Sequence, residues 1–308
     1  MPPVKSTRGN VTQPSCRPDF PPLPFSIVIP AYNEAGAIGR CLDRILRTMP
    51  EGADVEIIVV PNGCHDETAE IARRFEPRVR VIELAEGSKA AALNAGNAAA
   101  TATPRLFVDA DIDIDFAVLA ALADALREPG VMAASPAALL DTDACSPLVR
   151  AYYRVWSRHR YLEHGVGGSG VYGLSDQGLA RLGDFPPIIA DDGYVRALFS
   201  PSEQYRVSEG SAGQPIYATV RPPRTVRELI VSEARWRAGD AQVGALLGAA
   251  AHLETKAGNA SGLAKSGAAV PDLAAYYAIK LMGRLTLLSN RVRRVHHLWH
   301  RDVSSRGG

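Results

Sequence analysis

From residue 25 onward, short runs of β-forming residues alternate with longer stretches of helical periodicity. Strands are expected at 25–29, 55–60, 79–83 and 105–108, and the helices between them at 36–48, 67–75 and 89–100. Strands separated by helices imply right-handed crossovers, which place the strands in a mainly parallel central sheet flanked by helices. The predicted fold class is therefore α/β, with ligands expected outside the carboxyl ends of the strands.

Size and charge exclude several functions. With 308 residues and 46% hydrophobic content, the chain can form one large domain, or one domain with an appendage. Its 34 Lys and Arg residues nearly balance its 33 Asp and Glu residues, so no overall field attracts nucleic acid. The spacing of the cysteines fits neither a zinc site nor a disulfide framework, which favours a reducing cytoplasm. These cysteines are Cys16, Cys41, Cys64 and Cys145.

Three segments are expected along the chain. Residues 1–24 contain seven prolines and no apolar core of a signal peptide, so they are predicted to be a flexible leader. Residues 25–236 are expected to form the main domain, and residues 237–308 a helical appendage with a basic tail. The basic residues of the tail are Arg291, Arg293, Arg294 and Arg301. No run approaches the ~20 consecutive apolar residues that span a bilayer.

Two carboxylates, Asp109 and Asp111, follow the strand expected at 105–108. On an extended segment their side chains project to the same face. Hard cations such as Mg2+ take oxygen ligands from one or two carboxylates together with substrate phosphates. The pair therefore indicates a divalent metal and phosphate chemistry, although solvated loops show the same pattern.

Polar side chains also follow the first expected strand. Pro30 is expected to end that strand because it has no N–H to donate, so that Tyr32, Asn33 and Glu34 lie in a loop before a helix. The loop has no G-x-G-x-x-G pattern, which argues against a dinucleotide-dependent dehydrogenase.

The loops after the second and third strands carry further candidates. The amide of Asn62 has both a donor and an acceptor, as needed to read the edge of a nucleobase. Asp66 either takes part in this site or caps the next helix. Lys89 begins a helix, where the helix dipole disfavours a cation, so an anion such as a diphosphate is expected beside it. A solvated lysine is the alternative.

In this order, these motifs resemble the family 2 glycosyltransferases of GT-A fold, over roughly residues 25–236. The resemblance implies that Pro30, Tyr32, Asn33 and Glu34 help to bind the nucleotide. The family's turn after the second strand, Asp-Asp-Gly-Ser, is replaced here by Pro-Asn-Gly-Cys. With this departure, nucleotide binding through Asn62 is still expected, but the resemblance no longer indicates which base is bound.

Two other motifs carry the resemblance. The family's Lys-x-x-Ala-Leu-Asn-x-Gly is matched from Lys89, through Asn94, to Gly96. By the same resemblance, Asp109 and Asp111 contact the sugar nucleotide and its Mg2+ or Mn2+. The motif does not extend to the acidic residues that follow, Asp113 and Asp115.

The second half of the domain resembles the acceptor side of the family. The glycine-rich segment containing Gly167, Gly168 and Ser169 resembles the loop that lines the acceptor and donor-sugar site, where close backbone approach needs glycine. A simple hairpin turn is the alternative. Asp191 and Asp192 resemble the family's Glu-Asp pair, which makes Asp192 the general base. Adjacent carboxylates repel each other, and either could instead cap a helix, Asp191 more readily.

The segment from Ser232 to Trp236 matches half of the Gln-x-x-Arg-Trp motif of processive synthases. Arg235 is a candidate for binding diphosphate, and Trp236 for stacking on a sugar. An amphipathic helix would carry the same residues. Because Ser232 replaces the glutamine, nonprocessive transfer is favoured.

The resemblance thus implies an inverting, metal-assisted hexosyltransferase whose donor is a nucleoside-diphosphate sugar, expected to be a UDP-sugar. Asp192 removes the acceptor proton, while a metal on Asp111 and the cation of Lys89 stabilise the leaving diphosphate. The acceptor hydroxyl is expected on a glycolipid or polysaccharide precursor, or on a secondary metabolite. The alternatives are a noncatalytic nucleotide-sugar binding module and a nucleotidyltransferase, which usually has a glycine-rich loop after its first strand.

The appendage contains an amphipathic helical pattern at 272–290. Such a helix can pack on the core, form a homodimer or lie on an anionic bilayer. The expected location is the cytoplasm, at the inner face of the membrane if the acceptor is a lipid.

Overall fold

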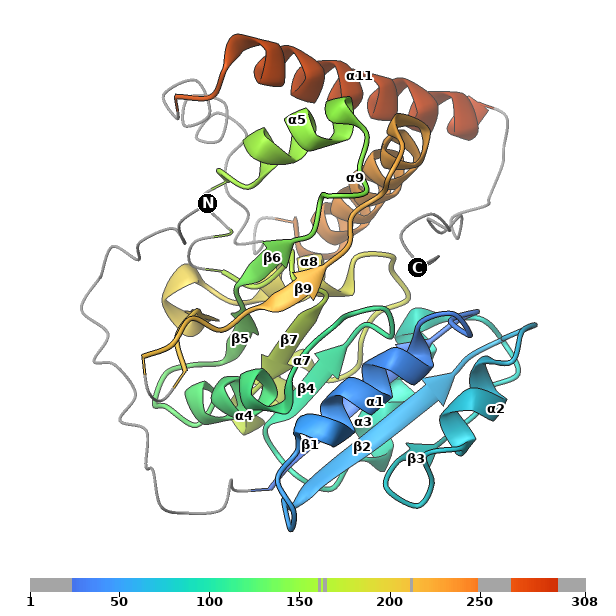
Figure 1. Cartoon of the computed structure of the whole chain (residues 1–308), viewed down its shortest axis with the longest axis vertical. Coiled ribbons are helices and arrows are strands. Elements are labelled where there is room, and N and C mark those ends of the chain that lie inside the picture. Colours follow the sequence, from blue (N-terminus) through green and yellow to red (C-terminus); the bar gives the residue numbers. More distant parts are fainter. Residues whose placement is uncertain (1–23, 160–161, 163–164, 211–212, 249–266, 293–308) are drawn as a thin grey trace.

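Seven strands form the central sheet of the protein (Figure 1). The structure, a computed structural model, describes residues 24–159, 162, 165–210, 213–248 and 267–292. The strands are β1 (Phe25–Ala31), β2 (Val55–Pro61), β3 (Arg80–Val81), β4 (Arg105–Val108), β5 (Ala133–Pro136), β7 (Val171–Leu174) and β8 (Gln204–Val207). Their order across the sheet is β3-β2-β1-β4-β7-β5-β8.

The first four strands pair in parallel, as the sequence predicts. The prediction that Pro30 ends the first strand is wrong, because β1 continues to Ala31. The N–H of Ser26 donates to the carbonyl of Pro104 on the β4 side. Because successive residues of a strand face opposite neighbours, Pro30 faces the same side as Ser26, where pairing with β4 has already ended at Val28. The missing N–H of Pro30 therefore breaks no ladder bond.

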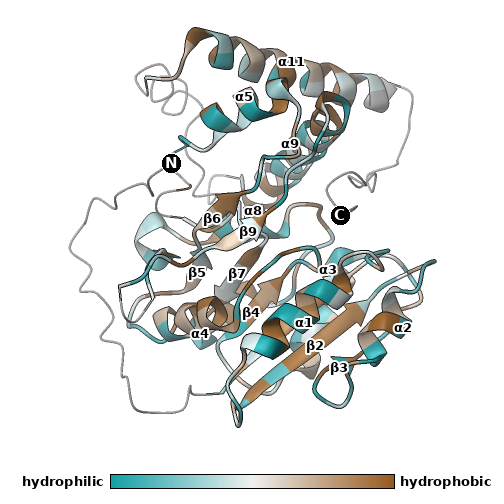
Figure 2. Cartoon of the chain, in the orientation of Figure 1, coloured by the Kyte–Doolittle hydropathy of each residue, from teal (hydrophilic) through white to brown (hydrophobic). Residues whose placement is uncertain are grey.

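Helices cover both faces of this sheet. One face carries α1 (Ile38–Thr48), α2 (Thr68–Arg73) and α4 (Phe116–Ala125), and the other carries α3 (Lys89–Ala99) and α8 (Asp191–Leu198). In Figure 2, α1 turns hydrophilic residues outward, above the hydrophobic β2. On the opposite face, a Cβ on Gly96 would lie 2.3 Å from Cγ1 of Val28. The glycine of the Lys-to-Gly motif thus lets α3 pack closely on β1.

The second half of the sheet departs from simple alternation. Strand β7 is antiparallel to both β4 and β5, and β8 is parallel to β5. Beside the sheet, β6 (Ala138–Leu140) and β9 (Ala218–Val220) form a parallel pair. The other elements of this half are α5 (Pro147–Trp156), α7 (Asp176–Leu182) and the short 3-10 helix η1 (Pro201–Glu203).

Helices α5, α9 (Val226–Leu247) and α11 (Val270–Val292) pack together as a separate layer (Figure 1). The predicted boundary at residue 236 falls inside α9, so the appendage shares that helix with the main domain. The leader, apart from residue 24, and the tail residues Arg293, Arg294 and Arg301 lie outside the described residues. In the part of the chain that is described, no helix is both long and apolar enough to cross a membrane.

Candidate active site

The side chain of Lys89 joins two carboxylates from distant parts of the chain. Its Nζ lies 2.7 Å from Oδ1 of Asp109, just after β4, and 2.9 Å from Oδ1 of Asp191, the first residue of α8. Burial lowers the pKa of Lys89, but the two carboxylates outweigh this and hold its pKa above the ordinary value. In this structure protein carboxylates pair with Lys89, so the alternative of a solvated lysine is wrong, and the diphosphate expected beside this helix start stays a prediction.

Asp191 is the buried member of the acidic pair. Its side chain accepts a hydrogen bond of 2.9 Å from the hydroxyl of Tyr172 in β7, in addition to its contact with Lys89. Burial raises the pKa of Asp191, the charges of Asp109 and Asp192 raise it further, and Lys89 opposes them. The alternative that either aspartate caps α8 is wrong, since Ala190 takes the N-cap position without a side-chain hydrogen bond.

Asp192 is half-buried and faces the glycine-rich segment. Its Oδ1 accepts a 2.7 Å hydrogen bond from the N–H of Gly193, and its Oδ2 lies 3.4 Å from where a Cβ on Gly167 would stand. Of the two adjacent carboxylates, Asp192 is thus the more exposed, while Asp191 is held by Lys89 and Tyr172.

The glycine-rich segment has a conformation that only glycine adopts readily. Gly167, Gly168 and Gly170 have φ values of 121°, 80° and 66°. A Cβ on Gly168 would lie 3.1 Å from the ring of Trp156, and the N–H of Asp109 donates to the carbonyl of Gly170 over 2.8 Å. A hairpin turn would connect β7 to a strand that directly precedes it and pairs with it. In the described chain the element before this segment is helix α5, so the hairpin alternative is wrong.

Polar residues that the sequence analysis missed fix this segment. Arg206 in β8 donates to the carbonyl of Gly167 over 3.0 Å, and the side-chain oxygen of Gln204 accepts from the N–H of Val166 over 2.9 Å. Ser169, predicted to contact a sugar, is buried and donates to the carbonyl of Val171 over 2.8 Å. We therefore assign Ser169 to the turn rather than to a substrate.

Two asparagines that were predicted to bind the nucleotide hold the backbone instead. The Nδ2 of Asn62 donates to the carbonyls of Ala31 and Val60, and its Oδ1 accepts from the N–H of Ser88 over 3.0 Å. Asn94 exchanges two hydrogen bonds with the backbone of Phe185. Because these amides bond within the fold, we correct the predictions that Asn62 reads a base and Asn94 binds donor.

The loop after β1 is tied to the loop after β2. Asn33, with a φ of 52°, accepts from the N–H of His65 over 2.8 Å, and the N–H of buried Glu34 donates to Thr68 over 2.7 Å. The carboxylate of Asp66 accepts from the N–H groups of Ala35 and of Thr68, which begins α2. Asp66 therefore accepts a hydrogen bond from the first residue of α2, although Glu67 and not Asp66 is the N-cap residue. This agrees in part with the capping alternative.

Tyr32 links this pair of loops to the loop before Lys89. A Cβ on Gly87 would lie 3.1 Å from the Tyr32 ring, so the ring and the glycine turn are in close approach. The loops after β1 and β2 and the start of α3 thus surround one edge of the sheet, the edge to which Asp109 also belongs.

Asp109 and Asp111 are the candidate metal ligands. The Asp109 side chain is 39% exposed and Asp111 is half-buried, whereas Asp113 and Asp115 pair with Arg221 and Arg44 over 2.6 and 2.5 Å. Among the described residues, no cluster of three or more His, Cys, Asp or Glu side chains could hold a metal alone. Two carboxylates fit an ion that takes its remaining ligands from a diphosphate.

The half-motif on α9 lies in the helical layer. Trp236 packs against the apolar cluster of α5, α9 and α11, and Glu233 bonds to Tyr152 there. Arg235 is half-buried on the same helix. The ring of Trp236 is thus used in packing, which corrects its predicted stacking on a sugar. Arg235 was predicted to bind the same diphosphate as Lys89. Among the described residues, no hydrogen bond or ion pair links the two side chains, so this role of Arg235 stays a prediction.

Helix α9 nevertheless reaches the active-site segment from its next turns. The Oε1 of Gln242 accepts from the N–H of Ile189 over 2.9 Å, and a Cβ on Gly239 would lie 2.6 Å from Cβ of Ala190. Both contacts fix the backbone immediately before Asp191.

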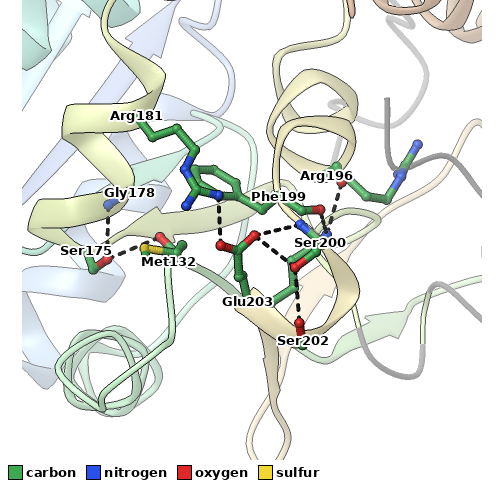
Figure 3. A network of polar contacts seen from close by, with 10 residues as sticks. Met132, Ser175, Gly178, Arg181, Arg196, Phe199, Ser200, Ser202 and Glu203 are labelled. Atoms are coloured by element: carbon green, nitrogen blue, oxygen red, sulfur yellow. Dashed lines mark hydrogen bonds and ion pairs between the residues drawn. The ribbon is translucent and has the colours of Figure 1, made fainter. Parts of the chain in front are cut away.

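At the other end of α8, the side chain and N–H of Ser200 bond to Glu203, which pairs with Arg181 over 2.8 Å (Figure 3). Helix α8 is therefore held at both ends.

Replacing Tyr172 by phenylalanine is expected to lower the free energy of unfolding by about 1–3 kcal/mol, because Asp191 loses a buried hydrogen-bond donor. Denaturant unfolding measures this change. Tyr194→Phe, a half-buried change on α8, is the matched control. Equal stability of the Tyr172 variant and wild type would show that this hydrogen bond does not hold Asp191.

Known proteins resemble this chain in sequence and in fold. Residues 26–165 match the model of glycosyl transferase family 2. The uncharacterised glycosyltransferase EpsJ of Bacillus subtilis is 40% identical over 89 residues, or 28% of this chain and 25% of the relative. A dolichyl-phosphate beta-glucosyltransferase of Drosophila melanogaster is 31% identical over 174 residues, 50% of this chain and 52% of the relative. The chain thus spans about a quarter to a half of these relatives.

A mannosyltransferase from Pyrobaculum calidifontis, solved in complex with GDP-mannose and Mn2+, has a similar fold. Its TM-score is 0.53, its sequence identity is 21%, and the match covers 87% of each chain. The predicted α/β fold of GT-A type, with a mostly parallel sheet and C-terminal helices, is confirmed.

Proposed function

We propose that this chain, a family 2 glycosyltransferase by its match over residues 26–165, transfers a sugar from a nucleoside-diphosphate sugar to an acceptor hydroxyl with inversion. The observation that carries the proposal is the contact of Lys89 with both Asp109 and Asp191. It joins the metal-type carboxylates after β4 to the helix that carries Asp192. A cation for the diphosphate and a base for the acceptor therefore belong to one connected site.

In the proposed reaction, Asp192 takes the proton of the acceptor hydroxyl, and the acceptor oxygen forms a bond to the anomeric carbon from the face opposite the diphosphate. The bond from that carbon to the diphosphate oxygen breaks, and the nucleoside diphosphate leaves. Lys89 stabilises the charge that develops on the leaving group. The glycine-rich segment allows the sugar to approach the backbone beside Asp192.

Asp109 and Asp111 are the residues that would hold Mg2+ or Mn2+. When bound, a divalent ion would neutralise charge on the diphosphate and so lower the barrier to its departure. The exposure of Asp109 leaves room for phosphate oxygens to complete the ligand set. The Tyr32–Glu34 loop remains our candidate for binding the nucleoside.

Nucleotide binding tests this proposal directly. Thermal unfolding is measured with UDP, GDP and dTDP, each with and without Mn2+, and we expect a metal-dependent stabilisation with one of them. A ligand at 100 times its Kd adds about 2.7 kcal/mol. GDP stands beside the predicted UDP because the Pyrobaculum enzyme is in complex with GDP-mannose. Folded protein that none of the three stabilises would contradict the proposal.

Gln242 is expected to act on the proposed reaction by positioning the segment before Asp192. Gln242→Leu removes the oxygen that accepts from Ile189, so kcat should fall about tenfold, equivalent to the roughly 1.4 kcal/mol of one hydrogen bond, with the donor KM unchanged. Gln242→Glu keeps an acceptor oxygen and should recover most of kcat. Steady-state kinetics of both variants measure the effect, and equal kcat in Gln242→Leu and wild type would contradict it.

The class of acceptor, a glycolipid or polysaccharide precursor or a secondary metabolite, remains a prediction. The cytoplasmic location also remains a prediction. The Drosophila relative is named for dolichyl phosphate, which supports testing lipid-linked acceptors first. A noncatalytic binding module is the remaining rival, and it would bind nucleotide without releasing it from a sugar donor.

A further inference from the structure

Helix α11 has one face that is fixed to the protein. Tyr276 and Ile279 are each 3% exposed and pack in the cluster with α5 and α9. Lys280 pairs with Glu233 over 2.8 Å, and a Cβ on Gly283 would lie 2.7 Å from Cβ of Glu233. The orientation of α11 about its own axis is therefore set by α9.

The opposite face of α11 carries an exposed apolar stripe. Its residues recur every three or four positions, so they lie along one side of the helix. They are Tyr277 (49% exposed), Leu281 (57%), Leu285 (56%) and Leu288 (49%), with Met282 (49%) beside them. In Figure 1 this helix forms one edge of the molecule, beyond α5 and α9. Packing against α5 and α9 therefore leaves these five apolar side chains of α11 about half exposed.

Positive charge accompanies this stripe. Arg284 is exposed and lies on the stripe's side of the helix, three residues after Leu281 and four before Leu288. From residue 273 to the last residue of the sequence, the only acidic residue is Asp302. Besides Lys280, which pairs with Glu233, the basic residues of the same range are Arg284, Arg291, Arg293, Arg294, Arg301 and Arg306. A partner for this region therefore combines an apolar layer with negative charge.

We propose that the α11 stripe, formed by Tyr277, Leu281, Leu285 and Leu288 with Met282, docks on the surface of a bilayer rich in anionic phospholipid. A helix with an apolar face and basic flanks lies in the interface with its apolar side chains among the acyl chains. Basic residues near such a surface are attracted to anionic headgroups. The helix would lie on the bilayer rather than cross it, because it is not apolar enough to span one.

A second copy of the chain fits this surface less well. Pairing two stripes around a twofold axis would bring the exposed Arg284 side chains of the two copies close together, and like charges repel. Lipid headgroups supply the opposite charge over the whole length of the stripe. The charge balance therefore favours a lipid surface over self-association.

Flotation with vesicles tests the proposal on the full chain. The vesicles contain phosphatidylcholine alone or phosphatidylcholine with phosphatidylglycerol, and we expect binding to the anionic vesicles that weakens as salt is raised. The double variant Leu281→Ser/Leu285→Ser should bind at least about tenfold more weakly, because two apolar side chains no longer leave water. Leu148→Ser is the matched control, since Leu148 lies on α5 and is 56% exposed, as Leu285 is.

Three results would overturn the proposal. The first is wild-type protein that binds neither vesicle type, and the second is a folded double variant that binds anionic vesicles as wild type does. The third is a concentration-dependent dimer, seen by light scattering, that the double variant abolishes, since the stripe would then serve a second copy. Circular dichroism confirms that the variants fold. No residue of the active site is changed, so these outcomes are separate from those that test sugar transfer.

Discussion

Asp192→Asn is expected to lower kcat by about 10²–10⁴-fold while donor affinity stays at its wild-type value. Asparagine keeps the size of the side chain and an oxygen that accepts from Gly193, but it cannot take a proton from an acceptor hydroxyl. The neighbouring Asp191 cannot replace it readily, because Lys89 and Tyr172 occupy its carboxylate. Donor titration and steady-state kinetics on the same preparation separate binding from catalysis.

The matched control is Asp184→Asn, an exposed carboxylate in the segment before α8. It removes the same charge without touching the site, so its kcat should equal that of wild type. If Asp192→Asn kept kcat within about threefold of wild type, a base contribution of 10²-fold or more would be excluded. Asp191 would then have to be considered as the base.

Lys89→Met is expected to remove donor binding and to lower the free energy of unfolding by roughly 2–4 kcal/mol. Methionine fills a similar volume but leaves Asp109 and Asp191 without their shared cation. Breaking a fully buried pair costs about 3–5 kcal/mol, and the 39% exposure of Asp109 reduces that cost. Denaturant unfolding measures stability, and titration with the stabilising nucleotide measures binding.

A second substitution separates these two effects of Lys89. In Lys89→Met/Asp191→Asn the uncompensated buried charge is gone, so stability should recover in part. Donor binding should not recover, because the cation proposed to contact the diphosphate is still missing. Recovery of both would mean that Lys89 acts only through stability. Full donor affinity in the single variant would likewise contradict the role given to Lys89.

The first half of the fold follows from local patterns. The alternation of strands and helices predicts the elements from Phe25 to Val108, because each is a short run with its own periodicity. Pro30 was misplaced because its effect depends on where pairing with β4 stops, which is a property of the sheet. The antiparallel position of β7 between β4 and β5 likewise depends on which strands pair in the folded chain. The periodicity of a single segment carries no information on that pairing.

The sequence predicts the surroundings of a side chain best where the residue type has one main kind of partner, as a charged side chain has. The sequence predicts a charged partner for Lys89 but suggests a diphosphate, whereas the structure pairs Lys89 with Asp109 and Asp191. Amides serve backbone and ligand equally well, so Asn62 and Asn94 were assigned to the nucleotide when they hold loops.

Other residues of the site left no local signal. Tyr172, Gln204, Arg206 and Gln242 act through contacts with segments 19 to 53 positions away, so only the folded chain reveals them. Each bonds to a group beside the proposed base or to the glycine-rich segment. Long-range polar contacts thus explain most of what the sequence analysis missed in the site.

The central claim is that one connected site both binds and cleaves a nucleoside-diphosphate sugar. Release of nucleoside diphosphate from the matching sugar donor, with Mn2+ and with water or an added alcohol as acceptor, measures this most directly in wild type and in Asp192→Asn. We predict metal-dependent release by wild type, and loss of release in a variant that still binds the nucleotide. Binding of the donor by wild type without release, or equal release by both proteins, would contradict the account.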